Sequence, residues 1–412
     1  MARPVLVDGL TWRLAWRNVG RHPRRTLIVV SAISVGIWGV FLTMALNFGM
    51  VFQMVDTAIS TELGHLQVHA RGFDRKPGLE ERIEGGAAWA ERNLEALPGL
   101  RAWAPRVRSE GLLYSPRASV GVRVVAIDPE REPRVSRLAD SVVEGTYLEG
   151  ARRRVLIGEA LARRLSVQIG DKLVLSVQDA TGEMTGEAYR VGGLFRTAWS
   201  EIDRGVVYMR LDEGQRLFAI GDAVSELVVV AEARDQVDGL RDAIAADLGG
   251  GLRVQTWKEL RPLLDYMVST MDQSAWWVYA AVFVAMAFGI ANVLLMAVYE
   301  RIREIGVLMA IGMRPRRLVG MILAESVLLA AIGLALGLGA ALATTAALAD
   351  GIDLSRFAEG LNAYGIGTRI VPVIRSQDVT TPLGVALATA LLASLWPALH
   401  AVRIRPADAV RR

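Results

Sequence analysis

Four long stretches of the chain contain no charged residue, and they constrain the fold more than any other feature. They cover residues 26–55, 273–299, 326–349 and 379–402. Each exceeds the roughly 20 apolar residues that cross a hydrocarbon core about 30 Å thick, whereas a helix of a soluble protein averages about 11–12 residues. We therefore predict an α-helical membrane protein with four transmembrane helices. The first stretch is too long for a secretory signal and no small-residue cleavage site follows it, so it should remain as an anchor.

The arginines predict the orientation of these helices. Residues 1–25 hold six Arg and one Asp, the loop 300–317 holds five Arg and two Glu, and the tail 403–412 holds four Arg and one Asp. Acids outnumber basic residues in 350–378 and in 56–272. By the positive-inside rule, both termini and the 300–317 loop are cytoplasmic, and the other two segments are extracytoplasmic. This is the topology of a multi-pass protein of the cell inner (plasma) membrane, and basic residues at membrane edges do not favour nucleic acid as a partner.

These boundaries divide the chain into nine segments. We expect a cytoplasmic N-terminal segment (1–25), a first span with its stalk (26–55), an extracytoplasmic domain (56–272), a second span (273–299), a cytoplasmic coupling helix (300–317), a third span (318–349), an extracytoplasmic loop (350–378), a fourth span (379–402) and a cytoplasmic tail (403–412).

The 56–272 insert has the pattern of a large α+β domain. Strands are expected at 65–70, 155–158, 172–178, 189–195, 205–209, 227–231 and 252–256, with helices at 79–97, 159–165 and 235–248. Strand-helix alternation around 155–178 and again around 227–256 suggests two subdomains, with 182–193 in a smaller, β-rich one. Both flanking helical patterns continue past the apolar stretches into charged sequence, including Asp56, Glu62 and Arg261. Such charges do not belong in lipid, so the first two spans should project outward as stalks; the alternative is simply longer membrane helices.

Several chemistries lack the residues they need. The chain has no cysteine, and none of its three lysines follows a glycine, so a P-loop is absent. His65 and His69 have the HxxxH spacing of a helical metal site, but the alternation around them favours a strand, where about 13 Å would separate them. No G-x-S-x-G sequence is present. We expect no metal site, no catalytic residue and no cofactor in this polypeptide.

The stretch 300–312 alternates charged and apolar residues at helical spacing. The apolar residues Ile302, Ile305, Leu308 and Met309 fall on one side. Arg301 and Glu304 fall on another. An amphipathic helix of this kind at the inner membrane face can dock into a groove of a soluble partner, or it can serve as an ordinary interfacial anchor.

This stretch resembles the FtsX-like permease family, membrane subunits of type VII ABC transporters that include the lipoprotein-releasing LolC/LolE pair and the MacB exporters. In that family an E-R-x-R-E-I-G-x-x-x-A-x-G sequence follows the second span. The matching residues are Glu300, Arg301, Arg303, Glu304, Ile305, Gly306, Ala310 and Gly312.

Other parts of the chain carry the same resemblance. They are Ala15-Trp16-Arg17-Asn18-Val19 with Arg24-Arg25-Thr26, the 158–162 and 170–171 segments, and a terminal signature formed by Trp396-Pro397-Ala398, Ala401, Arg403, Pro406 and Ala407. MacB proteins carry a fused nucleotide-binding domain that this chain lacks, so the resemblance favours the LolC/LolE arrangement.

The resemblance implies a mechanism. Two identical or homologous permeases would sit on a cytoplasmic ABC ATPase dimer that binds ATP and Mg, with 300–317 as the coupling element. ATP-driven closure would be transmitted through the stalks to a MacB-like periplasmic domain. The implied partners are a lipoprotein substrate, a periplasmic chaperone and membrane lipid. The implied function is release of lipoproteins from the inner membrane for outer-membrane targeting. The alternatives are MacB-like export of peptides, antibiotics or other amphiphiles, transmembrane signalling to a cell-wall hydrolase, and a membrane-anchored enzyme.

Three further features of the spans are candidates for function. Glu325 lies within the third hydrophobic segment, about 12 Å of helix from Arg317, and is either close enough to the interface to stay wet or an intramembrane polar site with a role in coupling. Gly333 and Gly337 form a small-residue face for close helix packing. Outer-end residues either contact the lipid chains of a substrate or, for the tryptophans, form an aromatic belt; they are Met44, Phe48, Phe52, Met54, Trp276 and Trp277.

Overall fold

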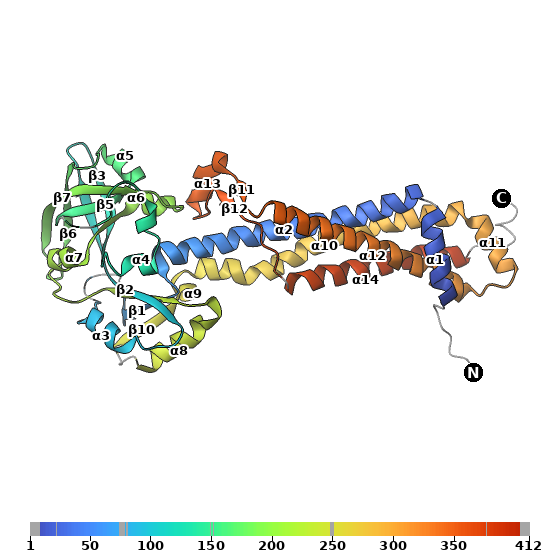
Figure 1. Ribbon diagram of the computed structural model, residues 1–412, viewed down its shortest axis with the longest axis horizontal. Coiled ribbons are helices and arrows are strands. Elements are labelled where there is room, and N and C mark those ends of the chain that lie inside the picture. The colour runs from blue at the N-terminus through green and yellow to red at the C-terminus, as the bar shows by residue number, and fades with distance from the viewer. Residues whose placement is uncertain are drawn as a thin grey trace. The chain divides into compact units, whose positions relative to one another are not determined.

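The computed structural model describes residues 9–21, 23–73, 79, 81–148, 150, 152–247, 251–375 and 377–403 (Figure 1). It divides into two compact units. Unit 1 comprises Met1–Met50, Ser269–Ile352 and Val371–Arg412, and unit 2 comprises Val51–Val268 and Asp353–Ile370.

The long stretches of unit 1 that carry no charge are rich in alanine and leucine, residues with a high helix propensity, and they form helices. Within the described residues, four helices are long and apolar enough to cross a membrane, over Thr26–Leu63, Pro262–Glu300, Pro315–Ala347 and Val379–Val402. This confirms the four predicted spans. The helices of the unit are α1 (Gly9–Arg21), α2 (Pro23–Ala58), α10 (Pro262–Glu300), α11 (Ile302–Ala310), α12 (Pro315–Ala347) and α14 (Gln377–Arg403), of which α2 and α10 continue into unit 2.

The helices α2 and α12 approach closely where α12 carries glycine. A Cβ atom built on Gly333 would lie 2.7 Å from Cβ of Ile33, and one on Gly337 would lie 2.7 Å from the Ser34 carbonyl oxygen. The Ser34 hydroxyl donates a hydrogen bond of 3.0 Å to the Gly333 carbonyl. The absent side chains therefore let the two backbones meet, which is how small residues act in membrane-helix packing.

Unit 2 is built around one mixed sheet. Its strands are β1 (Leu66–Ala70), β2 (Leu100–Tyr114), β3 (Ser119–Ile127), β4 (Val142–Gly145), β5 (Arg154–Gly158), β6 (Lys172–Gln178), β7 (Met184–Phe195), β8 (Val206–Arg210), β9 (Glu226–Ala231) and β10 (Leu252–Thr256). Its helices are α3 (Gly86–Asn93), α4 (Glu132–Val135), α5 (Glu159–Leu165), α6 (Ser200–Gly205), α7 (Leu211–Leu217), α8 (Val237–Asp247) and α9 (Trp257–Leu260).

The strand order is β10-β1-β9-β2-β3-β8-β5-β7-β4, with β6 paired to β2 and β7. Neighbours are antiparallel except for β3–β8 and β5–β7. The long strand β2 pairs with β9 through its first half and with β6 through its last four residues. Strand β2 thus joins two lobes, one with β1, β9, β10, α3 and α8 and the other with β3 to β8; Figure 1 labels α3, β1, β10 and α8 on one side of β2 and β3, β5, β6 and β7 on the other. The division into two subdomains stays a prediction, because both lobes share one sheet and one apolar cluster.

The core of unit 2 follows from strand periodicity. Alternate residues of β3 and β6, such as Val120, Val122, Leu173 and Leu175, are buried in one apolar cluster that extends across both lobes. The helices α3, α5, α7 and α8 contribute Ala90, Leu161, Leu217 and Leu240 to the same cluster.

Three predicted elements differ in the structure. The helix expected over 79–97 is only α3, because Ile83 forms a β-bridge with Val224 and Gly85 adopts a left-handed conformation just before the helix begins. The 300–317 segment is not one helix: α11 covers only Ile302–Ala310, while Glu300 ends α10 and Pro315 begins α12. The loop 350–378 contains structure of its own: a β11–β12 pair (Ile352–Asp353 and Arg369–Ile370) and α13 (Ala358–Ala363).

Candidate functional site

The backbone around α11 sets the geometry of the candidate site. α10 ends at Glu300, and Arg301 has non-helical dihedral angles (φ −104°, ψ 17°) that interrupt the helix. α11 ends because Gly312 has φ +99°, a left-handed conformation that glycine adopts without strain. Pro315 then begins α12, a position where its missing N–H is not needed.

The helix α11 has one packed face and one open face. Ile305 and Gly306 are buried, and Ile305 packs in a cluster with Val298, Leu318, Ile322 and two alanines of α14. Arg303, Glu304, Val307 and Ile311 are exposed. The exposed face therefore carries both charge and apolar surface, which suits a protein partner better than bulk water.

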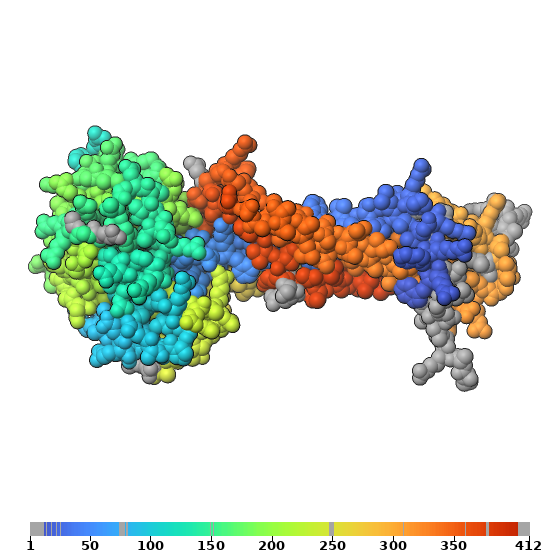
Figure 2. All heavy atoms as spheres, viewed as in Figure 1, coloured from blue at the N-terminus to red at the C-terminus, as the bar shows by residue number. Residues whose placement is uncertain are grey.

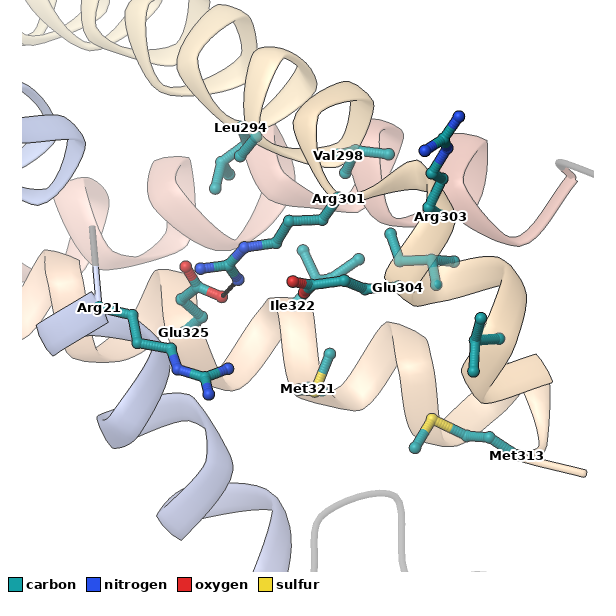
Figure 3. Close-up of a pocket in the computed structure, with 13 residues that line it drawn as sticks. Arg21, Leu294, Val298, Arg301, Arg303, Glu304, Met313, Met321, Ile322 and Glu325 are labelled. Carbon is teal, nitrogen blue, oxygen red and sulfur yellow. Dashed lines mark ion pairs between the residues drawn. The ribbon is translucent and has the colours of Figure 1, made fainter. Parts of the chain in front are cut away.

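A groove of about 550 Å³ lies beside this helix in unit 1 (Figure 3). Its walls are the apolar side chains of Leu294, Ala297, Val298, Ile305, Val307, Met313, Met321 and Ile322, and its charged residues are Arg21, Arg301, Arg303, Glu304 and Glu325. In Figure 3, Arg301 and Arg303 leave the chain in different directions, and Glu304 extends over Ile322. The helix α1 lies on the surface of unit 1 beside this region (Figure 2) and supplies Arg21.

Glu325 is 5% exposed and lies within α12, where it pairs with Arg301. The nearest nitrogen–oxygen distance is 3.6 Å, from Arg301 Nη1 to Glu325 Oε2. Nη2 of Arg301 is buried and donates no hydrogen bond to the described residues. The carboxylate thus faces the protein and supplies a countercharge at the beginning of α11. This ion pair links the third span to the segment that follows the second span.

Other predicted site residues are distributed over both units. Met44 and Phe48 are buried in unit 1, where the Arg375 guanidinium lies 4.0 Å from the centre of the Phe48 ring. Met54 is buried in unit 2, and Phe52 lines a separate pocket there. The lipid contact expected for these four residues stays a prediction. Trp276 and Trp277 are exposed, as either an aromatic belt or a lipid contact requires.

His69 lies on β1 and His65 immediately precedes that strand, so the expected strand begins one residue later than predicted. His65 Nδ1 accepts a hydrogen bond from the Ala231 N–H, whereas the His69 ring stacks on Phe73. Among the described residues, no group of three or more His, Asp or Glu side chains is arranged to hold a metal ion.

Sequence reasoning missed a cluster of buried charges in unit 2. Arg106, Glu132 and Glu226 are each at most 2% exposed, and Glu62 is 7% exposed. The sequence contained one indication of this cluster: Arg106 and Arg108 are two residues apart on a strand, so their side chains must lie on the same face of the sheet. Their partners come from segments too distant in sequence for a local pattern to indicate.

Comparison with known proteins places these features in a family. Residues 26–247 match the family model of the MacB-like periplasmic core domain, and residues 277–406 match that of the FtsX-like permease C-terminal region. The lipoprotein-releasing system transmembrane protein LolC of Xylella fastidiosa (strain Temecula1) is 25% identical over 425 residues, covering 100% of both chains.

LolC of Neisseria meningitidis serogroup B (strain MC58) is 20% identical over 433 residues, covering 98% of both chains. The macrolide export ATP-binding/permease protein MacB of Nitrobacter winogradskyi is 36% identical over 129 residues, covering 30% of this chain and 17% of that protein.

Proposed function

Because this chain belongs to the FtsX-like permease family and carries a MacB-like periplasmic core domain, it is an ABC transporter permease, and we propose that it releases lipoproteins from the inner membrane for outer-membrane targeting. The observation that supports this substrate is the extent of the likeness to LolC. That likeness runs through both units, whereas the MacB relative named above matches less than a third of the chain.

An ABC ATPase is the partner that family membership implies, and α11 is our candidate for its docking element. Its buried face fixes it to α10, α12 and α14 through Ile305. Its exposed face presents Arg303, Glu304, Val307 and Ile311. No ion pair involves Glu304 within the described part of the chain, so its carboxylate is available to a basic group of the ATPase.

We place ATP and Mg on that ATPase and both termini of this chain in the cytoplasm. A second permease, identical or homologous, completes the transporter, and a periplasmic chaperone receives the lipoprotein. ATP-driven movement reaches unit 2 through α2 and α10, the two helices that continue into it.

Reconstitution with the ATPase tests the docking element. Glu304→Lys reverses a charge on the exposed face, so we expect the variant to lose permease-dependent ATP turnover and binding to the ATPase. Glu144→Lys, an exposed substitution on β4 in unit 2, should leave both unchanged. If the permease does not alter ATP turnover at all, or if Glu304→Lys behaves like wild type, α11 is not the coupling element.

Depletion of the protein tests the substrate. We expect lipoproteins to accumulate in the inner membrane when the permease is depleted, and a normal outer-membrane complement would refute lipoprotein release. MacB-like export is the second candidate, because the MacB relatives match local parts of the chain. Export would be indicated by co-purification of an outer-membrane channel with a periplasmic adaptor.

A further inference from the structure

The charged cluster of unit 2 surrounds Glu62, which lies where the first long helix ends. After Ala58 the α2 helix continues as a π-helical turn over Ile59–Leu63, and Gly64 ends it with φ +64°. β1 begins two residues later, at Leu66. Glu62 thus occupies the junction between a membrane helix and the sheet, and π-helical turns are frequent at functional positions.

Three guanidinium groups hold the Glu62 carboxylate. Arg123 Nη1 lies 2.8 Å from Oε1, and Arg261 Nη2 lies 3.0 Å from Oε2. Arg108 Nη1 is a third partner, 3.5 Å from Oε1. These arginines lie on β3, immediately before α10, and on β2, so one carboxylate connects the end of the first helix, the start of the second and two central strands.

The main chain of the helix end is held as well. The Glu62 carbonyl accepts a hydrogen bond from Nη1 of Arg106. Arg106 is in turn fixed by two hydrogen bonds to the Glu132 carboxylate, of 3.0 and 2.6 Å. The Leu63 carbonyl accepts a bond of 2.9 Å from the side-chain amide of Gln67 on β1.

These contacts fix the orientation of the helix end relative to the sheet more than they add to the free energy of unfolding. Desolvating charges costs free energy, so a buried ion pair is seldom more stable than a well-packed apolar replacement. Once formed, however, a buried network of several charges permits few geometries, because any displacement leaves a charge uncompensated. Here the network holds β2, the strand that takes part in both lobes of the domain.

We propose that Glu62 is a positioning residue for force transmission: it locks the outer ends of α2 and α10 to β2 and β3, so that the helix ends and the sheet of unit 2 move as one body. This inference rests on the proposed transport function and adds to it the residue that couples helix movement to the domain. Glu62 does not touch the substrate; it acts through Arg108, Arg123 and Arg261.

The absence of cysteine from the chain makes a direct measurement possible. Leu263→Cys at the start of α10 and Met184→Cys on β7 replace two exposed residues of unit 2 and can both carry nitroxide spin labels. In the full-length protein in nanodiscs, we expect a narrow distribution of label–label distances. Glu62→Gln keeps the side-chain shape but removes its charge and should broaden that distribution, while Glu62→Asp should restore part of the order.

A matched control separates positioning from general stability. Glu213 is also a buried carboxylate of unit 2, but it accepts a hydrogen bond from the Arg153 N–H and lies on α7, away from this cluster. Glu213→Gln should leave the distance distribution narrow even if it lowers the melting temperature. If Glu62→Gln does not fold, Arg261→Gln removes the contact between Glu62 and the residue before α10, together with the packing of Arg261 on Trp199, and should broaden the distribution.

The functional readout uses the complex with its ATPase. The Glu62→Gln complex should still assemble and hydrolyse ATP, but should lose lipoprotein release. A narrow distribution in folded Glu62→Gln or Arg261→Gln, or release equal to wild type, would overturn the inference. Failure of the wild-type complex to release lipoprotein would instead refute the proposed function, because the distance measurement needs neither ATPase nor substrate.

Discussion

Arg106 is a fully buried cation whose charge is maintained by carboxylates from two other elements. Burial opposes the charged form, but Glu132 and Glu226 outweigh it and hold the pKa of Arg106 above its usual value. Burial also raises the pKa of Glu226, although Arg108 and Arg106 lie beside it. A charge of this kind is retained only where its partners are held in place, so the ionisation of these residues depends on the sheet around them.

His65 should make the stability of unit 2 depend on pH. Burial, followed by the charge of Arg234, lowers the pKa of His65 below its ordinary value, although Asp56 acts in the opposite direction. The ring is therefore neutral when folded, with Nδ1 accepting from Ala231. Below about pH 6.5 the unfolded chain binds the proton more readily, so stability should fall as the pH is lowered from there toward the folded pKa.

His65→Asn should weaken this dependence, because asparagine does not titrate. The measurement is the thermal midpoint of unit 2 in the detergent-solubilised chain at a series of pH values between neutral and mildly acidic. Equal slopes for wild type and His65→Asn across that range would contradict the prediction.

Helix packing in unit 1 depends on where the glycines of α12 fall relative to α2. Gly333 and Gly337 face Ile33 and Ile37, whereas a Cβ atom on Gly339 would meet nothing within 4 Å. These three glycines of α12 therefore differ in their importance for helix packing, and the sequence of α12 alone does not show this difference.

Gly333→Ala should destabilise the helical unit. Its new Cβ atom would lie 2.7 Å from Cβ of Ile33, and overpacking of this kind typically costs about 1–3 kcal/mol. Gly339→Ala is the matched control: it adds the same methyl group in open space and should be neutral or stabilising by up to about 1 kcal/mol through helix propensity. Thermal unfolding of both variants in one detergent measures the difference, and equal midpoints would show that α2 and α12 are not in close contact.

At the scale of the whole molecule, family membership confirms the resemblance carried by the short motifs. The two family models divide the chain between a MacB-like periplasmic core region and an FtsX-like permease region. The four apolar helices agree with a protein of the inner membrane that carries an extracytoplasmic domain. Which side of the membrane each terminus occupies remains a prediction from the distribution of arginine.

Thiol labelling tests that topology. Met184→Cys in unit 2 and Ile311→Cys after α11 each place one exposed cysteine in a chain that has no other. A membrane-impermeant reagent applied to intact spheroplasts should label Met184→Cys but not Ile311→Cys, which should react only after permeabilisation. Labelling of Ile311→Cys in intact spheroplasts would place α11 outside the membrane and exclude it as a contact for a cytoplasmic ATPase.

Local patterns in the amino-acid sequence were sufficient to determine the membrane spans, most strands of unit 2 and the family. A charge-free stretch or a two-residue alternation lies within one element, so it can be recognised without knowing what packs against that element. The same holds for the predicted α5 and β6, whose bounds agree with the structure. The predicted helix at 79–97 was too long because Ile83, in its first part, forms a β-bridge with Val224, which is far away along the chain.

Only the tertiary structure decided which residues meet. Glu62 and Arg261 are 199 positions apart, and Ser34 and Gly333 are 299 apart. Their contacts follow from strand order and from the packing of α2 against α12. Neither of these can be predicted from the spacing of residues within one helix or strand. Arg301 and Glu325 were each identified from the sequence, but their pairing needed the chain reversal at Gly312. Local physics therefore determined the elements of this permease, and the path of the chain between them determined the charged contacts of α11 and Glu62.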